Sequence, residues 1–374
     1  MNIKLINMSF RYHFRFLIIT VVLLFMASCS PRIYNQSSKE VVIYPAPPDT
    51  ARIQYLTSIS GSKDIMHKQS AFAKSIVGEE KTLSIYKPYG IFMRNGKLYV
   101  CDVSLGGGLE IIDFENKTFN YFVPKAQYRL KLPLNCYVDA NNQLYVADIS
   151  LRKIIVFNGE GKYITSFGKK ENEKPTDVFV HGNKIWVPDS GNNRVNVYNK
   201  NTYAFEYYFP KSEKGDDNFL YKPTNIFVSD DKVYVSDMGH ANVKVYTHKG
   251  EYLMSIGKYG KNIGEFVRPK GIAVDRESNL YVVDASFENV QIFNKDGELL
   301  LFFGGSYEGP GGMWLPTKVI IDYDNLKYFE EYVDPKFDLE YLIFVANQFG
   351  PDKVSVYGRI APKKGKTKSK KTKN

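Results

Sequence analysis

Five aspartates recur at a near-constant interval along the chain, and carboxylates are common general acids, general bases and metal ligands. They are Asp102, Asp148, Asp189, Asp237 and Asp284. Each ends a short run rich in β-branched and aromatic residues, such as residues 280–284. An Asp at the end of a strand accepts backbone N–H groups of the following turn, and this one role accounts for all five. We therefore expect the five carboxylates to be structural, and we predict no catalytic residue.

Cations recur with the same period, directly before a proline that opens each unit of the pattern. Two units have Leu132 and Leu315 at this position, and the other four have Lys87, Lys174, Lys222 and Arg268. Two residues after the prolines come Gly90, Asn135, Asp177, Asn225, Gly271 and Lys318. If the units surround a common axis, cations converging above polar groups can hold an anionic ligand or a peptide carboxylate.

The predicted ligand site therefore consists of the four cations together with Asn135, Asp177 and Asn225. Two alternatives remain open. Each cation can pair with the aspartate of its own unit, or the axis can be a water-filled channel.

Histidines and cysteines give no recognisable metal or nucleophile motif. After residue 28 the histidines are His67, His181, His240 and His248, and we expect each to be exposed or satisfied by local hydrogen bonds. Cys101 and Cys136 fall in apolar runs and lack metal-type spacing, so we expect buried free thiols rather than a disulfide. We predict no cofactor and no bound metal.

Short strands in a repeated unit must position these residues. The prolines that open the units lie 42 to 48 residues apart: Pro88, Pro133, Pro175, Pro223, Pro269 and Pro316. The fifth unit contains four strand-like runs, at residues 271–275, 280–284, 290–293 and 298–303. A four-stranded sheet of this size cannot bury both faces alone, so the copies must stack. The pattern predicts an all-β protein, a six-bladed β-propeller with four antiparallel strands per blade.

The sixth unit departs from the pattern in two ways. Its proline lies 31 residues before the equivalent Asn347, against 14 or 15 residues in the other units, which indicates an insertion at about residues 325–339. It also lacks a fourth strand before the lysine-rich end of the chain. Residues 52–59 resemble the fourth strands at residues 163–168 and 252–257. We expect this N-terminal strand to complete the last blade.

Several of the repeated phrases resemble a known family. Residues 257–260, 264–275 and 189–198 are similar to NHL repeats, with fainter versions at residues 217–223 and 312–316. The resemblance covers roughly residues 50–360 and implies a six-bladed β-propeller. Such propellers include lyases, lactonases, RNA binders, sensors and protein-binding scaffolds, so the resemblance leaves the function open. The zinc-binding histidines of amidating lyases with this fold cannot be mapped onto the histidines of this chain.

The N-terminus has the layout of a bacterial lipoprotein export signal. Lys4, Arg11 and Arg15 precede an apolar run at residues 16–25, and residues 26–29 (Met-Ala-Ser-Cys) resemble a lipobox. The run is too short to span a bilayer well. The resemblance implies cleavage before Cys29 and acylation of that residue, with an ordinary signal peptide as the alternative. No acidic run follows Cys29, so we favour a periplasm-facing domain, on the outer rather than the inner membrane.

The net charge of +10, from 50 basic and 40 acidic residues, resides at the two ends of the chain. The three cations of the signal and seven lysines after residue 360 account for all of it, because neither segment contains an acid. A neutral propeller lacks the basic bias of nucleic-acid-binding domains, so we predict no nucleic-acid partner. The tail can attract anionic lipid or an acidic partner, or simply keep the protein in solution.

These observations predict four segments: a signal peptide at residues 1–28, a tether at 29–50, an NHL-type propeller at 51–360 and a disordered basic tail at 361–374. The favoured function is a membrane-anchored envelope lipoprotein whose propeller binds a protein, peptide or glycan without catalysis. The alternative is a metal-dependent lyase or hydrolase with an active site in the channel.

Overall fold

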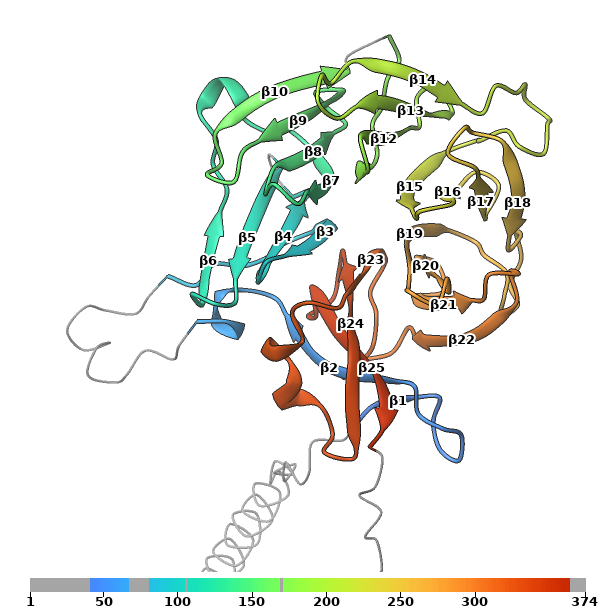
Figure 1. Cartoon of the computed structure of the whole chain (residues 1–374). Coiled ribbons are helices and arrows are strands. Elements are labelled where there is room, and N and C mark those ends of the chain that lie inside the picture. Colours follow the sequence, from blue (N-terminus) through green and yellow to red (C-terminus); the bar gives the residue numbers. More distant parts are fainter. Residues whose placement is uncertain (1–40, 67–80, 105–106, 169–170, 364–374) are drawn as a thin grey trace, which may run out of the picture. The chain divides into compact units, whose positions relative to one another are not determined.

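The computed structural model describes residues 41–66, 81–104, 107–168 and 171–363, which belong to one compact unit. The predicted signal peptide, Cys29 and the tail beyond residue 363 lie outside the described residues. Antiparallel sheets stand around a common axis (Figure 1). The innermost strand of the last sheet contacts that of the first, so the ring is closed. The protein is a six-bladed β-propeller, as predicted.

Strand order within the blades follows the chain outward from the axis. Blade 1 consists of β3 (Pro88–Arg94), β4 (Lys97–Asp102), β5 (Gly108–Asp113) and β6 (Thr118–Tyr121). Blade 2 consists of β7 (Pro133–Val138), β8 (Leu144–Asp148), β9 (Lys153–Phe157) and β10 (Tyr163–Gly168). Blade 3 consists of β11 (Phe179–His181), β12 (Lys184–Asp189), β13 (Arg194–Asn199) and β14 (Phe205–Phe209).

The second half of the ring repeats this arrangement up to the last blade. Blade 4 consists of β15 (Pro223–Val228), β16 (Val233–Asp237), β17 (Asn242–Tyr246) and β18 (Tyr252–Ile256). Blade 5 consists of β19 (Pro269–Val274), β20 (Leu280–Asp284), β21 (Asn289–Phe293) and β22 (Leu299–Gly304). Blade 6 combines β23 (Pro316–Asp322), β24 (Phe337–Asn347) and β25 (Val354–Pro362) with β2 (Ile53–Ile59) and β1 (Ile43–Tyr44).

Short 3-10 turns make up the helical content of the described residues. They are η1 (Ser62–Asp64), η2 (Ala126–Tyr128), η3 (Leu326–Tyr328) and η4 (Glu330–Tyr332). No helix in the described part of the chain is long and apolar enough to cross a membrane.

The predicted N-terminal strand completes the last blade. β2 pairs antiparallel with β25, with Ile53 opposite Arg359 and Ile59 opposite Val354. A further strand, β1, pairs with β2 and lies within the segment predicted as a tether. The last blade therefore has five strands where four were expected, and the ordered chain begins before residue 51.

The insertion in the sixth unit lies over the seam between blade 6 and blade 1. It was predicted at residues 325–339, but β24 already begins at Phe337, so the last three of these residues belong to a strand. Asn325 Oδ1 accepts the N–H of Gly96 in blade 1 at 2.8 Å. The ring of Phe329 packs 5.3 Å from that of Phe114. The insertion thus joins the last blade to the first.

In blades 1 to 5 the recurring Pro is the cross-strand partner of the recurring Asp, as in Pro88 with Asp102, and in blade 6 Pro316 pairs with Asn347. Asp102 Oδ2 accepts the N–H groups of Tyr86 and Lys87 at 2.7 and 2.9 Å, and its Oδ1 accepts that of Ser104 at 2.7 Å. The same kinds of contact are made by Asp148, Asp189, Asp237 and Asp284. These bonds are the structural role that the sequence predicts for the five carboxylates.

The core consists of six clusters of buried side chains, one between each pair of neighbouring blades. The cluster between blades 6 and 1 includes Phe344 and Ile91, and that between blades 3 and 4 includes Trp186 and Tyr246. Every blade therefore buries both faces, but only because it has a neighbour on each side. The Cys101 and Cys136 thiols lie in the cluster between blades 1 and 2, where both are buried and not joined by a disulfide.

Candidate ligand site in the central channel

The first strands of the blades line the central channel, and successive side chains along them form distinct layers. The layer two residues beyond the prolines is buried in all four blades that have a side chain longer than that of glycine there. The layer four residues beyond the prolines consists of Phe92, Tyr137, Phe179, Phe227, Ala273 and Ile320. With a strand rise of roughly 3.3 Å per residue, the two layers lie about 7 Å apart along the axis.

An ion pair crosses the channel in its middle layer. Lys318 Nζ in blade 6 lies 2.6 Å from Asp177 Oδ2 in blade 3, the blade on the opposite side of the ring. The two residues are 7% and 1% exposed. Asp177 Oδ2 also accepts hydrogen bonds from Asn225 Nδ2 at 3.1 Å and from the Ile226 N–H at 3.2 Å.

Asn135 binds the neighbouring blade rather than facing an open channel, since its Nδ2 donates to Thr176 O at 2.7 Å. The amide oxygens of Asn135 and Asn225 are buried and have no hydrogen-bond partner within the described residues. A side chain at Gly90 would place its Cβ 2.4 Å from Asn135 Oδ1, so this crowded layer requires glycine there. The middle of the channel is filled by protein side chains.

Asp177 also interrupts the first strand of its own blade. Pro175 pairs with Asp189 in an isolated bridge, whereas the continuous strand β11 begins only at Phe179. Between them the Val178 N–H is bound by Asp177 Oδ1 at 2.9 Å. The sequence pattern had predicted a strand running directly from the proline.

The four predicted cations lie at the proline end of the channel. Lys174, Lys222 and Arg268 are exposed, and the Lys87 ammonium lies 5.1 Å from the centre of the Phe349 ring. Within the described residues none of the four forms an ion pair with the aspartate of its own blade, because that carboxylate instead binds backbone N–H groups. Binding of an anion by these cations stays a prediction.

A second side-chain contact across the channel narrows it just inside the proline end. Lys270 Nζ in blade 5 lies 3.0 Å from the Tyr89 hydroxyl in blade 1 and 4.9 Å from the centre of its ring. The Thr317 hydroxyl donates to Tyr89 O at 2.7 Å. A ligand entering from the proline end would have to displace this contact to reach the ion pair between Lys318 and Asp177.

The other end of the channel opens into an apolar pocket of about 250 Å³. Its wall carries four aromatic rings from consecutive blades: Phe92, Tyr137, Phe179 and Phe227. Neighbouring ring centres lie 4.5, 4.9 and 5.1 Å apart in that order. Ala273, Ile320 and Tyr323 complete the circle, and Lys318 lies at its floor. All four aromatic rings are partly exposed, so the wall is accessible.

Sequence reasoning missed this pocket, although the signal for it is present in the repeats. The residue four positions beyond the proline is aromatic in the first four units and aliphatic in the last two. Alternation along a strand places it on the same side as the polar layer. Taken singly, however, each of these residues indicates only an ordinary β-strand position.

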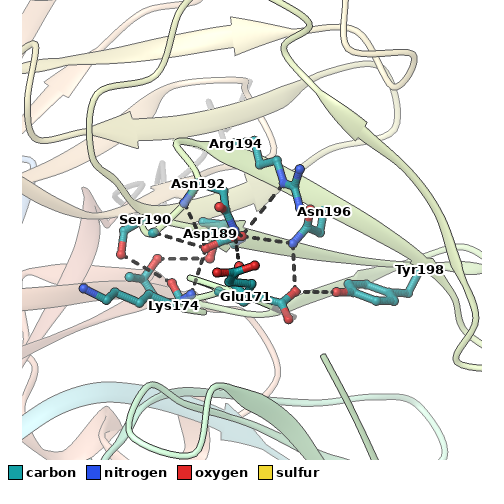
Figure 2. A network of polar contacts seen from close by, with 12 residues as sticks. Glu171, Lys174, Asp189, Ser190, Asn192, Arg194, Asn196 and Tyr198 are labelled. Carbon is teal, nitrogen blue, oxygen red and sulfur yellow. Dashed lines mark hydrogen bonds and ion pairs between the residues drawn. The ribbon is translucent and has the colours of Figure 1, made fainter. Parts of the chain in front are cut away.

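Blade 3 carries a polar network at its proline end. Figure 2 shows Asp189 at its centre, with Asn192, Arg194 and Asn196 directed toward it. The Asn196 amide also donates to Glu173 Oε1 at 3.0 Å, and Tyr198 donates to the same oxygen at 2.9 Å. Asp189 and Glu173 are buried. Because these carboxylates are bound on several sides by this blade, the network fixes the loop that enters it.

Two histidines far apart in sequence lie side by side. The rings of His181 in blade 3 and His248 in blade 4 are 5.6 Å apart, and His248 Nε2 lies 2.9 Å from Ser229 O. Burial lowers the pKa of His181, against the opposing effect of Asp230. His240 Nδ1 lies 2.7 Å from Asp237 Oδ2, and His67 falls outside the described residues.

Within the described residues, no three His, Cys, Asp or Glu side chains are grouped so that they could share a metal ion.

Comparisons with known proteins agree with the fold. A family model described as "6-bladed beta-propeller" matches residues 213–298, which comprise blade 4 and most of blade 5. No curated protein sequence matches the chain.

Many solved structures are similar to this chain, among them the following three. A structural genomics protein of unknown function from Bacteroides thetaiotaomicron has a TM-score of 0.57 and 14% identity, covering 82% of this chain and 76% of its own. Virginiamycin B lyase from Staphylococcus aureus has a TM-score of 0.52 and 13% identity, with 74% and 96% covered. A streptogramin B lyase has a TM-score of 0.51 and 15% identity, with 74% and 84% covered. At such identities the likeness shows the fold alone.

Proposed function

We propose that this protein is an envelope lipoprotein whose propeller is a binding module. Its binding site is the aromatic pocket at the end of the channel remote from the prolines, and its ligand is an apolar or aromatic side chain of a protein or peptide partner. The observation that carries this proposal is the continuous aromatic wall formed by Phe92, Tyr137, Phe179 and Phe227.

The chemistry of the pocket favours an apolar ligand. Its wall is aromatic and aliphatic, and the ammonium of Lys318 at its floor is already paired with Asp177. Aromatic rings contribute large contact areas and favour edge and stacked contacts with other rings. An incoming apolar group would displace water from this wall without leaving a charge unpaired.

The size of the pocket favours a side chain over a whole cofactor. Small-molecule sites usually enclose about 300–1,000 Å³, whereas this pocket holds about 250 Å³. One aromatic or branched aliphatic side chain, presented by a loop or an extended peptide, suits this volume. The surrounding hairpin tips would then contact the rest of the partner.

The envelope location is proposed from the sequence. The export signal and the lipobox-like residues 26–29 support acylation of Cys29 and attachment to a membrane. Two or three acyl chains would hold the protein there almost permanently, since each buried methylene contributes about 0.8 kcal/mol. We propose a periplasm-facing domain on the outer membrane, with the lysine tail free to meet anionic lipid or an acidic partner.

Site-specific photocrosslinking tests the pocket. A benzophenone amino acid at Ile320, which lines the pocket, is expected to capture a polypeptide from native envelopes. The same group at Leu300, exposed on the outer strand β22, is the control. Replacing both Phe179 and Phe227 by Ala should abolish capture at position 320, provided that the melting transition shows a folded ring. Equal capture at both positions, or capture unaffected by the double substitution, would refute the proposed site.

Two further measurements address the anchor and the enzymatic alternative. Labelling with a palmitate analogue should modify the wild-type protein and not Cys29→Ala, and that variant should leave the membrane fraction. Unchanged membrane association of Cys29→Ala would rule out the anchor. Stoichiometric zinc or calcium in the purified protein would instead favour the metal-dependent lyase or hydrolase.

A further inference from the structure

A second pocket, separate from the channel, lies at the proline end of blade 1. It measures about 360 Å³. Two carboxyl groups, Glu110 and Asp102, line it, together with the rings of Tyr86 and Tyr121. The Arg129 side chain stands exposed beside it. Tyr86 is 61% exposed, so the pocket is open to solvent.

The position of Glu110 within its blade has equivalents around the ring. On the third strand of blade 1 it pairs with Val100, two residues before the strand-end aspartate. The residues in the same register of blades 3, 4 and 5 are Asn196, Lys244 and Gln291. All four positions are buried, although all four side chains are polar.

In blades 3, 4 and 5 this position binds the segment that enters the same blade, whereas blade 2 has Ile155 there and blade 6 has Ser355. Asn196 Nδ2 donates to Glu173 Oε1 at 3.0 Å, and Lys244 Nζ donates to Asp217 O at 2.5 Å. In blade 5 the side chain at this position is the acceptor, because Gln291 Oε1 accepts the Gly264 N–H at 2.7 Å. The Gln291 contact shows that a side-chain oxygen at this position can receive an N–H donor.

Glu110 Oε2 and Asn196 Oδ1 are both buried without a hydrogen-bond partner within the described residues, but Asn196 is held by its Nδ2 donors, whereas Glu110 lines a pocket open to solvent. Glu110 as a whole is only 2% exposed. The neighbouring Asp102 cannot be the group in need of a ligand, since three backbone N–H groups already bind its two oxygens. A buried oxygen left unmatched costs about 1–3 kcal/mol, so an N–H donor entering the pocket would recover a substantial interaction.

We propose that this pocket binds a primary ammonium group carried on an alkyl stem. The ammonium donates to Glu110 Oε2, and the fixed negative charge of Asp102 attracts it further. The rings of Tyr86 and Tyr121 offer the faces and edges that favour a cation and cover the stem. Either a free alkylamine or a lysine side chain of a polypeptide provides this chemistry.

Binding is coupled to a proton. Burial, reinforced by the charge of Asp102, raises the pKa of Glu110 to about 9. At neutral pH the free site therefore holds a neutral carboxylic acid, and an ammonium displaces its proton. The other titratable groups facing it are Cys101 on β4, Tyr121 on β6, and Tyr86 and Arg129 at the opening, while Lys353 acts on Asp102.

Calorimetric titration of the full-length protein with n-butylammonium tests the proposal, with n-butanol as the uncharged control. Repeating the titration in buffers of different ionisation enthalpy measures proton release. We expect binding of butylammonium with release of close to one proton at neutral pH, and no binding of butanol. A blocked tripeptide with a central lysine distinguishes the sources: tighter binding of the peptide indicates a polypeptide ligand, and binding of butylammonium alone indicates a small amine.

Variants locate the site. Glu110→Gln keeps the shape of the side chain and should weaken butylammonium at least tenfold and abolish proton release. Tyr86→Ser, at an exposed position, should also weaken it. Glu160→Gln, an exposed carboxylate in blade 2, should change nothing. Equal affinity for butanol, unchanged affinity of Glu110→Gln, or absence of binding by both ammonium probes would each overturn the proposal.

Discussion

Lys318 and Asp177 meet across the axis of the propeller, with Nζ 2.6 Å from Oδ2, although 141 residues separate them in the chain. They belong to blades on opposite sides of the ring, so their contact spans the whole channel. Both are buried, and Asp177 receives two further hydrogen bonds from blade 4. This pair closes the channel between the cations at one end and the aromatic wall at the other.

Removing one member of this pair should destabilise the ring. Lys318→Met leaves the Asp177 carboxylate buried without its cation, and we expect a loss of about 3–5 kcal/mol in the free energy of unfolding. Replacing Asp177 by Leu in addition should recover part of it. Urea unfolding measures both values. Lys327→Met, which breaks an exposed ion pair with Glu115, is the matched control and should have little effect. A Lys318→Met variant as stable as the wild type would show that the pair contributes nothing to stability.

Each strand-end aspartate should contribute more to the stability of the fold than the asparagine at the equivalent position of the last blade. Asp284 accepts N–H groups of Val267, Arg268 and Ser286. Asp284→Ala should therefore lower the free energy of unfolding by about 3 kcal/mol, because it leaves several buried N–H donors without an acceptor.

Asn347 offers the comparison, since its Oδ1 accepts one N–H at 3.3 Å, while the Leu315 N–H is bound by Glu288 of blade 5. Asn347→Ala should cost less than Asp284→Ala in the same chemical denaturation assay. The exposed turn residue Asp296 serves as a control for loss of an acidic side chain in blade 5. Equal costs for Asp284→Ala and Asp296→Ala would contradict the structural role.

Closure of the ring by β2 predicts a sharp effect of a short deletion. Without residues 50–61, β25 loses its outer partner β2 and keeps only β24, and blades 5 and 6 lose Ile53 from their shared core. We expect the cooperative thermal transition to disappear. Ile53→Ala is the milder test and should cost about 2–5 kcal/mol. Leu253→Ala, on the exposed face of β18, should change stability little. A deletion variant that melts as sharply as the full chain would argue against a ring closed by β2.

Glu110 should give the protein a distinctive dependence on pH. Its pKa is raised to about 9 in the folded protein, against 4.5 for an ordinary glutamate, so the folded state binds more protons between these values. Its contribution to stability is thus complete below pH 4.5 and is lost as the pH rises toward 9.

The comparison with Glu110→Gln isolates this contribution. The wild type should lose stability relative to the variant across this interval, by at most about 1.4 kcal/mol per pH unit. Denaturant unfolding at a series of pH values measures the difference. A constant difference across the interval would show that Glu110 titrates normally in the fold.

The parts of the structure that could be predicted from sequence are those that every blade repeats. Pro269 and Asp284 recur because each blade needs the same strand end and the same turn, so their spacing reports the architecture. The strand at residues 52–59 was predictable because the sixth unit lacked a strand and this segment resembled the missing one. In both cases the residue types within a short stretch of sequence were enough to predict the element.

The site could not be predicted in the same way because it depends on distances across the ring. The repeats place Asp177 and Lys318 at equivalent positions near the channel, but only closure of six blades shows that these two pair across it. The same holds for His181 and His248, because nothing in the sequence indicates that their rings lie side by side. β1 was missed because two residues, Ile43 and Tyr44, are too few to carry a pattern.

The pairing of β2 with β25 also imposes an order on biosynthesis. Among the described strands, the first long one to be synthesised, Ile53–Ile59, pairs with the last one, Val354–Pro362. Ring closure must therefore wait until β25 has been synthesised, and until then the edge of β2 and the side chain of Ile53 remain uncovered. A chain interrupted before Val354 would leave an open arc of blades with two unpaired edges, which is the form most exposed to aggregation and proteolysis.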